Sequence, residues 1–452
     1  MFATFLYRNT TKLMWVFCSL LLLHSQKTQA QHELTMPFMH NLMQGSYTNP
    51  TLVNEYKAAF AVAPIFPSAA IAIKNTGFSV KDMIRKGPYG DSIYLPTILP
   101  KLKASNYLYV GSSLDLFVLM LKREDWHWSF NITEQVNARM SYPDNFARFV
   151  IKGNYDEEFY QKETKFKNLG LNAVHYREYG VGLTVDKHHW VFGGRVKLLF
   201  GKSNAYTSRT DVSVFSADTL IRLNNDIVLN TSYPDSAFDK RKYLLNNKNI
   251  GLAIDGGISY KPAHDIKLTL AFNNVGFINW KSNVTNRRLN ANVAYSGVKL
   301  QSIILQQENR PDQANVDFGI TNDSLADRFN PQETHNSYRT PLVGQSYFLA
   351  EYELDHQSEI GTGVYMEYFQ GVRTSWTLNY QRNLSSAFNF IASYSIHNKS
   401  YDNIGLGIMA RVGSVQVYFA GDNLIGIARG TNARNFNMRF GLNFVIGRTL
   451  HI

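Results

Sequence analysis

The sequence has almost no cysteine, few charged residues and no long apolar run beyond its N-terminus. Its 452 residues include one cysteine, Cys18, and only 18% of them are charged. Soluble globular proteins average about a quarter charged residues, and disordered chains contain fewer hydrophobic residues than the 44% found here. The mean hydropathy of −0.24 and the lack of ~18 consecutive apolar residues exclude a helical membrane protein. One membrane architecture remains, the β-barrel.

The N-terminus has the pattern of a cleaved signal peptide. Basic residues precede the apolar run 13–23, and Thr28-Gln29-Ala30 forms a small-x-small cleavage site. The alternative, a single membrane anchor, needs a longer run. We therefore predict that residues 1–30 are a signal peptide. Its removal eliminates Cys18 and leaves no disulfide or thiolate site, which favours a bacterial envelope protein.

The positive charge is scattered rather than concentrated. Removal of residues 1–30 takes away Arg8, Lys12 and Lys27 and lowers the net charge from +11 to +8. The densest basic cluster, residues 240–242, stands in a polar connection. A nucleic-acid-binding protein would gather its bases on one element, so we expect no nucleic-acid partner.

Polar and apolar residues alternate along most of the mature chain. In residues 126–140, aromatic and aliphatic side chains share one face while polar side chains share the other. Similar segments begin near residues 190, 250, 372, 388 and 404. Alternation over ten or more residues is typical of strands between lipid and an aqueous lumen, since strands of soluble proteins average about five or six residues. The pattern predicts an all-β fold, a transmembrane antiparallel up-and-down β-barrel in the bacterial outer membrane.

Connection lengths predict how the barrel is organised. Short turns and longer loops alternate between predicted strand starts near residues 107, 126, 171, 190, 207, 219, 249 and 266 and then near 346, 360, 373, 386, 404, 415 and 437. One more strand near 56–65 closes the sheet, which gives sixteen strands or, on a second count, fourteen; we expect about 14–16. Residues 31–55 are expected to be a periplasmic N-terminal segment and residues 56–452 the barrel, with its C-terminus in the periplasm. Long excursions near 75–105, 141–170 and 301–345 carry short helical or Pro/Gly-rich stretches and are expected to act as plugs or lids.

The last strand allows a direct test of the wall. The alternation places Phe440 and Leu442 toward lipid and Arg439 and Asn443 toward the lumen. Arginine on the lipid face costs roughly 2–4 kcal/mol at the bilayer midplane. We therefore expect Phe440→Arg to impair folding into membranes and Asn443→Arg to be tolerated.

Charged residues on the polar faces of the strands are the candidate site residues. They are Arg195, Lys197, Asp255, Glu367, Arg411 and Arg439. They either form a solvated or self-paired lumen, or line a pathway and hold a plug through charge-assisted hydrogen bonds. Their mixed signs imply no ion selectivity.

Some segments resemble known barrel families. Asn49-Pro50, shortly before the first strand, resembles the Asn-Pro-Ala start of barrels similar to the long-chain fatty-acid transporter (FadL-like), a start shared by PorV-type proteins of the type IX secretion system; Thr51 replaces the alanine. Five further segments resemble an uncharacterised family of predicted outer-membrane barrels from Bacteroidota. These segments are 178–182, 193–201, 252–260, 274–280 and 338–342. This resemblance implies a location and a shape, not a reaction.

Motifs for catalysis are missing from the sequence. It contains no His-Glu-x-x-His, phosphate-loop or nucleophile-elbow pattern. His188-His189 could suggest metal binding, but adjacent strand residues point to opposite faces, and a polar turn explains the pair better. We expect no enzymatic activity, no cofactor and no metal site.

Two functions fit these observations. The first is transport of small apolar or amphipathic solutes across the outer membrane, because about sixteen strands can enclose a channel. The second is a non-enzymatic assembly or docking barrel for protein secretion or surface attachment. Expected partners are outer-membrane lipid, the barrel insertion machinery and, under the second function, an envelope or secretion-system protein.

Overall fold

The computed structural model of the chain describes residues 33–87, 90–218, 220–233, 239–295, 331–369, 371–397, 400–424 and 434–448. The predicted signal peptide, residues 296–300 and residues 301–330 of the third excursion lie outside these ranges. Among the helices that are described, none is long and apolar enough to cross a membrane.

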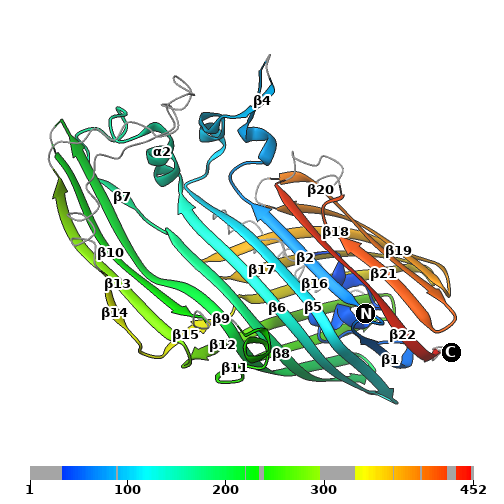
Figure 1. Cartoon of the computed structure of the whole chain (residues 1–452). Helices are drawn as coiled ribbons and strands as arrows, with labels where there is room; N and C mark the ends of the chain where they lie inside the picture. Colours follow the sequence, from blue (N-terminus) through cyan, green and yellow to red (C-terminus); the bar gives the residue numbers. More distant parts are fainter. Residues whose placement is uncertain are drawn as a thin grey trace, which may run out of the picture.

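Long antiparallel strands form one closed ring (Figure 1). The first half contains β5 (Ser105–Arg123), β6 (Trp126–Pro143), β8 (Gly170–Lys187) and β9 (Trp190–Ala217). The second half contains β16 (Gly344–Asp355), β17 (Ser358–Tyr368), β18 (Val372–Ser385), β19 (Phe388–His397), β20 (Ser400–Val412), β21 (Val415–Gly421) and β22 (Asn435–Arg448). The ring closes because β1 (Tyr56–Val62) and β2 (Ser68–Asn75) each pair with both β22 and β5.

Several positions in the ring are occupied by strands stacked end to end. The upper part of β9 pairs with β10 (Leu220–Ser232) and its lower part with β11 (Asn249–Ala263). β13 (Val284–Tyr295) pairs with β10, while β12 (Ile266–Trp280) pairs with β11. β14 (Gln332–Thr334), β15 (Tyr338–Pro341) and β16 then descend along β13 and β12. The described residues thus form a 14-strand barrel.

The count lies at the lower end of the predicted range for a physical reason. Strands were predicted to start separately near residues 190 and 207, but β9 runs unbroken through both for 28 residues. Starts predicted near 219 and 249 belong to β10 and β11, which share one position. The excursion between them contains α3 (Lys240–Leu244), which carries the basic cluster 240–242.

Short turns gather at one end of the barrel. β5 and β6, β8 and β9, and β11 and β12 are joined by tight connections, two of which contain a left-handed residue, Glu124 and His188, each with φ 53°. The chain leaves β22 at this end, opposite the start of β1. Short turns mark the periplasmic side of bacterial barrels.

The outer surface of the ring is apolar. In β22, Phe440 and Ile446 are 45% and 49% exposed, whereas Arg439 and Asn443 are 6% and 0% exposed, as the alternation predicts. Exposed apolar side chains continue around the wall on Trp128, Phe192, Leu252, Leu270 and Leu378. A closed antiparallel ring with an apolar outer face satisfies every backbone group without water. The protein is an outer-membrane β-barrel.

The first two long excursions stand above the outer end of the ring rather than inside it (Figure 1). They contain η3 (Val80–Met83), β3 (Ile84–Gly87), β4 (Gly90–Ile93), η4 (Leu95–Lys101), α2 (Asp144–Lys152) and β7 (Thr164–Phe166). This placement differs from that of a plug inside the ring, while the expectation that these segments act as lids stays a prediction. β5 and β6, 19 and 18 residues long, exceed the ~9–11 residues needed to span a membrane, so they carry the excursions outward.

Candidate functional site

The lumen is filled by residues 33–54, which we call the plug. It contains two short 3₁₀ helices, η1 (Met36–Phe38) and η2 (Met43–Tyr47), and lies inside the ring in Figure 1. Residues 31–55 were expected to form a periplasmic segment, and here the structure differs. The physical reason is that the plug has many apolar side chains, and these are buried where they contact the inner wall of the barrel.

Apolar side chains of the plug pack into three patches on the wall. Leu34 and Phe38 contact a cluster with Tyr347 and Tyr365, while Met43 packs against residues of β1 and β5. Met36, Met39 and Leu42 join a third cluster with Ile391, Met409, Tyr418 and Ala420. Burying such a side chain contributes about 1.5–3 kcal/mol, and flexible methionines adapt to an irregular lumen.

Polar contacts hold the plug at several heights. At its start, the Leu34 and Thr35 amides donate to the Asp422 carboxylate at 2.9 and 2.8 Å. Near its middle, Gln44 exchanges hydrogen bonds with Asn443, at 2.8 Å and 3.0 Å. Asn443 also donates to Gln416 at 2.9 Å. The expectation that Asn443→Arg is tolerated therefore conflicts with the structure, because an arginine there would displace the plug.

The Asn49-Pro50 motif ends the plug against the wall. The Asn49 side-chain oxygen accepts hydrogen bonds from the amide and hydroxyl of Thr51, at 3.1 and 2.7 Å. The Pro50 carbonyl accepts from the Thr184 hydroxyl at 2.7 Å. It also lies against Gly193, where a Cβ atom would approach the Pro50 oxygen to 2.0 Å. Only a residue without a side chain fits beside the Pro50 carbonyl, so Gly193 allows the end of the plug to lie against β9.

Two of the predicted lumen-facing residues bind the plug directly. Arg439 donates to Glu33 at 2.6 Å and lies 3.9 Å from Asp115. Arg195 donates to the Ser46 hydroxyl at 2.8 Å. Charge-assisted hydrogen bonds of this kind are roughly twice as strong as neutral ones. These two arginines therefore fit the alternative in which lumen charges hold a plug.

Other predicted residues pair with the wall itself. Asp255 pairs with the Lys197 ammonium at 2.8 Å and with Arg195 at 3.9 Å, and Lys197 also lies 3.6 Å from Glu178. Arg411 lies half-buried on the inner face, with its guanidinium 5.8 Å from the Tyr56 ring near the periplasmic mouth. These contacts correspond to the self-paired lumen.

Glu367 forms an ion pair that crosses the lumen. Its carboxylate lies 2.6 Å from Arg139 of β6 and 3.0 Å from Arg373 of β18. Around the ring, β17 lies six positions from β6, counted through β8, β9, β10/β11, β12/β13 and β14–β16. The pair therefore joins nearly opposite walls, and we call it the cross-lumen bridge. Both partners are buried, with Arg139 4% and Glu367 0% exposed.

A cavity of about 160 Å³ lies between the plug and the cross-lumen bridge. Its lining mixes small and apolar side chains with tyrosines and charged groups. It includes Ala70, Ala72, Val174, Leu342, Val343, Tyr109, Tyr176, Tyr347, Glu33, Glu178, Arg139, Lys197 and Arg439. The end of the third excursion, residues 340–343, thus reaches the cavity.

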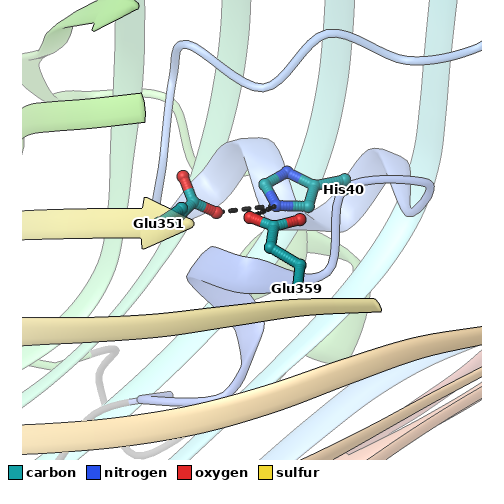
Figure 2. Close-up of side chains that lie close together, drawn as sticks. All are labelled: His40, Glu351 and Glu359. Atoms are coloured by element: carbon teal, nitrogen blue, oxygen red, sulfur yellow. Dashed lines mark ion pairs between the residues drawn. The ribbon is translucent and has the colours of Figure 1, made fainter. Parts of the chain in front are cut away.

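His40 anchors the plug near the periplasmic mouth. Its Nε2 lies 2.7 Å from Glu351 and 3.4 Å from Glu359, on adjacent wall strands (Figure 2). Burial lowers the pKa of His40, but attraction to these two carboxylates outweighs burial and raises the pKa to about 9. Next to this group is a cavity of about 690 Å³ that His188 and His189 also line.

Several of these residues escaped prediction from sequence. Arg139 and Arg373 fall on the polar faces of their strands, so the alternation could have indicated them. His40, Glu351 and Glu359 had no such signal, because their proximity depends on the path of the plug through the ring.

A family profile, described as a family of unknown function (DUF5723), matches residues 50–422. The chain belongs to this family. Membership of DUF5723 agrees with the resemblance to an uncharacterised barrel family, whereas the bacterial group implied by that resemblance stays a prediction. No curated protein matches the chain.

Solved structures similar to this DUF5723 member are distant. The Pseudomonas putida toluene transporter TodX has 8% identity and a TM-score of 0.39, with 92% of this chain and 93% of that chain covered. The Ralstonia pickettii toluene transporter TbuX has 6% identity and a TM-score of 0.43, with 94% and 97% covered. A Pseudomonas aeruginosa FadL homologue has 10% identity and a TM-score of 0.39, with 93% and 100% covered. At these values, what the chain does must be argued from its own geometry.

Proposed function

We propose that this barrel carries small apolar or amphipathic solutes across the outer membrane and that the cavity between plug and cross-lumen bridge is a transit site. The observation that carries the proposal is this cavity, which lies inside the ring between residues of the plug and the buried Arg139.

The size and lining of the cavity indicate the class of solute. A cavity of about 150 Å³ is enough for a molecule such as benzene. Ala72 and Val174 offer apolar contact, while Tyr176 and Lys197 offer hydrogen-bond donors that can orient a polar head. A compact molecule with one polar group fits this combination best.

In this proposal the plug and the cross-lumen bridge act as two closures, one on each side of the cavity. On the periplasmic side, plug contacts such as Ser46 to Arg195 and Gln44 to Asn443 are side-chain hydrogen bonds, which can break and re-form without unfolding a strand. On the outer side, one buried ion pair joins opposite walls. Transport requires each closure to open in turn.

Uptake into vesicles tests the proposal. Vesicles with the purified full chain should take up a labelled short-chain fatty acid or monoaromatic alcohol faster than empty vesicles. Ala72→Phe places a ring in the cavity and should slow uptake. Ile73→Phe is the matched control, because Ile73 is 41% exposed on the outer face of the same strand, and it should leave uptake unchanged. Equal rates with and without protein would refute transport.

A docking function is the second candidate, supported by the excursions above the ring. Ile93 is 76% exposed, and Val80 and Val150 are each 50% exposed, although all three are apolar and stand outside the membrane-spanning wall. Exposed apolar groups on a raised surface are typical of partner sites. Mild crosslinking followed by pull-down should then recover an envelope protein in stoichiometric amount, and recovery of insertion machinery alone counts against this function.

A further inference from the structure

Three potential metal ligands from separate elements meet where the plug passes the periplasmic end of β16 and β17. Figure 2 shows the His40 ring of the plug directed at the carboxylates of Glu351 and Glu359. One ligand atom from each residue lies within 4.8 Å of the others. These residues are not adjacent in sequence, so only the seated plug brings them together.

We propose that His40, Glu351 and Glu359 bind one divalent transition-metal ion of the Zn²⁺ type, which fastens the plug to the barrel wall. One imidazole nitrogen and two carboxylate oxygens form a donor set suited to Zn²⁺ and similar ions. Hard ions such as Ca²⁺ instead prefer six to eight oxygen ligands. A water molecule from the adjoining cavity would supply a fourth ligand.

The distances are close to those of a metal site. Tetrahedral bonds of about 2.0–2.1 Å place neighbouring ligand atoms roughly 3.3 Å apart. His40 to Glu359 is already 3.4 Å, and His40 to Glu351, at 2.7 Å, must open by about 0.6 Å to reach that spacing.

Glu351 is the most buried of the three ligands. It is 3% exposed, and within the described residues neither of its carboxylate oxygens accepts a hydrogen bond of regular geometry. Its contacts are ionic: Oε2 lies 3.1 Å from the Lys267 ammonium, and Oε1 faces His40. Buried carboxylates are normally hydrogen-bonded, paired or coordinated to a metal. Lys267 pairs with one oxygen, and the other oxygen, which faces His40, is the one that an ion between the two residues would bind.

The surroundings allow an ion to enter and favour its charge. The cavity of about 690 Å³ beside the three ligands is lined by further ionisable groups, Glu55, His188, His189, His264, Asp265 and Glu353. With neutral His40, two carboxylates and one ammonium leave a net charge of −1 at the site. The two carboxylates favour a divalent cation bound between them.

Metal titration of the full chain in lipid nanodiscs tests the inference. After chelator treatment, calorimetry with ZnCl₂ should show one Zn²⁺ per barrel, and CaCl₂ should not compete. His40→Gln and Glu359→Gln should each abolish stoichiometric binding. Glu353→Gln is the matched control, because Glu353 lines the same cavity but is outside the cluster, and it should bind as the wild type does.

Hydrogen exchange provides a readout that distinguishes a metal from a simple ion pair. Zn²⁺ at 100 times its Kd should slow exchange of the plug amides by about 100-fold in the wild type and leave exchange in His40→Gln unchanged. Heat-modifiable migration shows whether each variant is folded. Absence of Zn²⁺ binding to the wild type, or full binding to folded His40→Gln, would overturn the inference. Loss of binding in His264→Gln but not in His40→Gln would also overturn it, since the metal would then sit at the cavity rim. Solute uptake is not needed for any of these outcomes.

Discussion

The cross-lumen bridge offers the sharpest energetic prediction. At 2.6 Å and an effective dielectric constant of about 20, Arg139 and Glu367 attract each other by about 6 kcal/mol before desolvation is counted. Desolvation of the buried ions offsets much of this gain, and a variant without Arg139 and Glu367 still leaves the Arg373 guanidinium without its carboxylate, so the double variant retains part of the cost. Glu367→Gln alone leaves the Arg139 and Arg373 guanidiniums without a carboxylate and should lower the free energy of unfolding by about 3–5 kcal/mol.

A double-mutant cycle isolates the contact. The cycle uses Arg139→Gln, Glu367→Gln and the double variant. Each is refolded into vesicles and unfolded in urea, with tryptophan fluorescence as the probe. The three free energies of unfolding, compared with the wild type, should give a coupling energy of about 2–3 kcal/mol. An exposed pair provides the control: Arg288 and Asp226, joined at 2.9 Å on neighbouring strands, should couple by only about 0.2–1 kcal/mol. Additivity within about 0.5 kcal/mol for Arg139 and Glu367 would refute the bridge across the lumen.

Two further substitutions test the wall and the seat of the plug. Val136 lies on the lipid face, so Val136→Arg should cost roughly 2–4 kcal/mol near the midplane and reduce the yield of heat-modifiable barrel. Gln135 lines the cavity, so Gln135→Arg should leave that yield nearly unchanged. The reverse result would mean a register error of one residue. Gly193→Ala should push away the Pro50 carbonyl and speed hydrogen exchange of the plug amides. Gly194→Ala should not, because a Cβ atom there meets its nearest neighbour only at 4.0 Å. Equal exchange in the two variants would contradict the contact between Pro50 and Gly193.

The wall of the barrel could be predicted from sequence because its pattern is local. In β22, Phe440 and Asn443 fall on the predicted faces, since a strand between lipid and lumen imposes a period of two on every residue. The strand count could be predicted only as a range. Alternation shows that a segment is a strand, but it does not show that β9 is one long strand or that β10 and β11 share one position in the ring.

The contents of the lumen could not be predicted in the same way. The apolar side chains of residues 33–54 do not recur with the period of a strand or a long helix. Nothing in the sequence therefore shows that the barrel wall of the same chain buries them. The pairing of Arg139 with Glu367 joins residues 228 positions apart and depends on ring closure. Asn443 illustrates the limit: its face was predicted correctly, but its partner Gln44 was not.

We infer that the chain closes its own lumen from both sides, with the plug below and the cross-lumen bridge above. Ion conductance across a planar bilayer measures this closure. The full chain should show no steady current, whereas a chain without residues 33–54 that also carries Glu367→Gln should conduct. A steady current through the full chain equal to that of the altered chain would contradict the account.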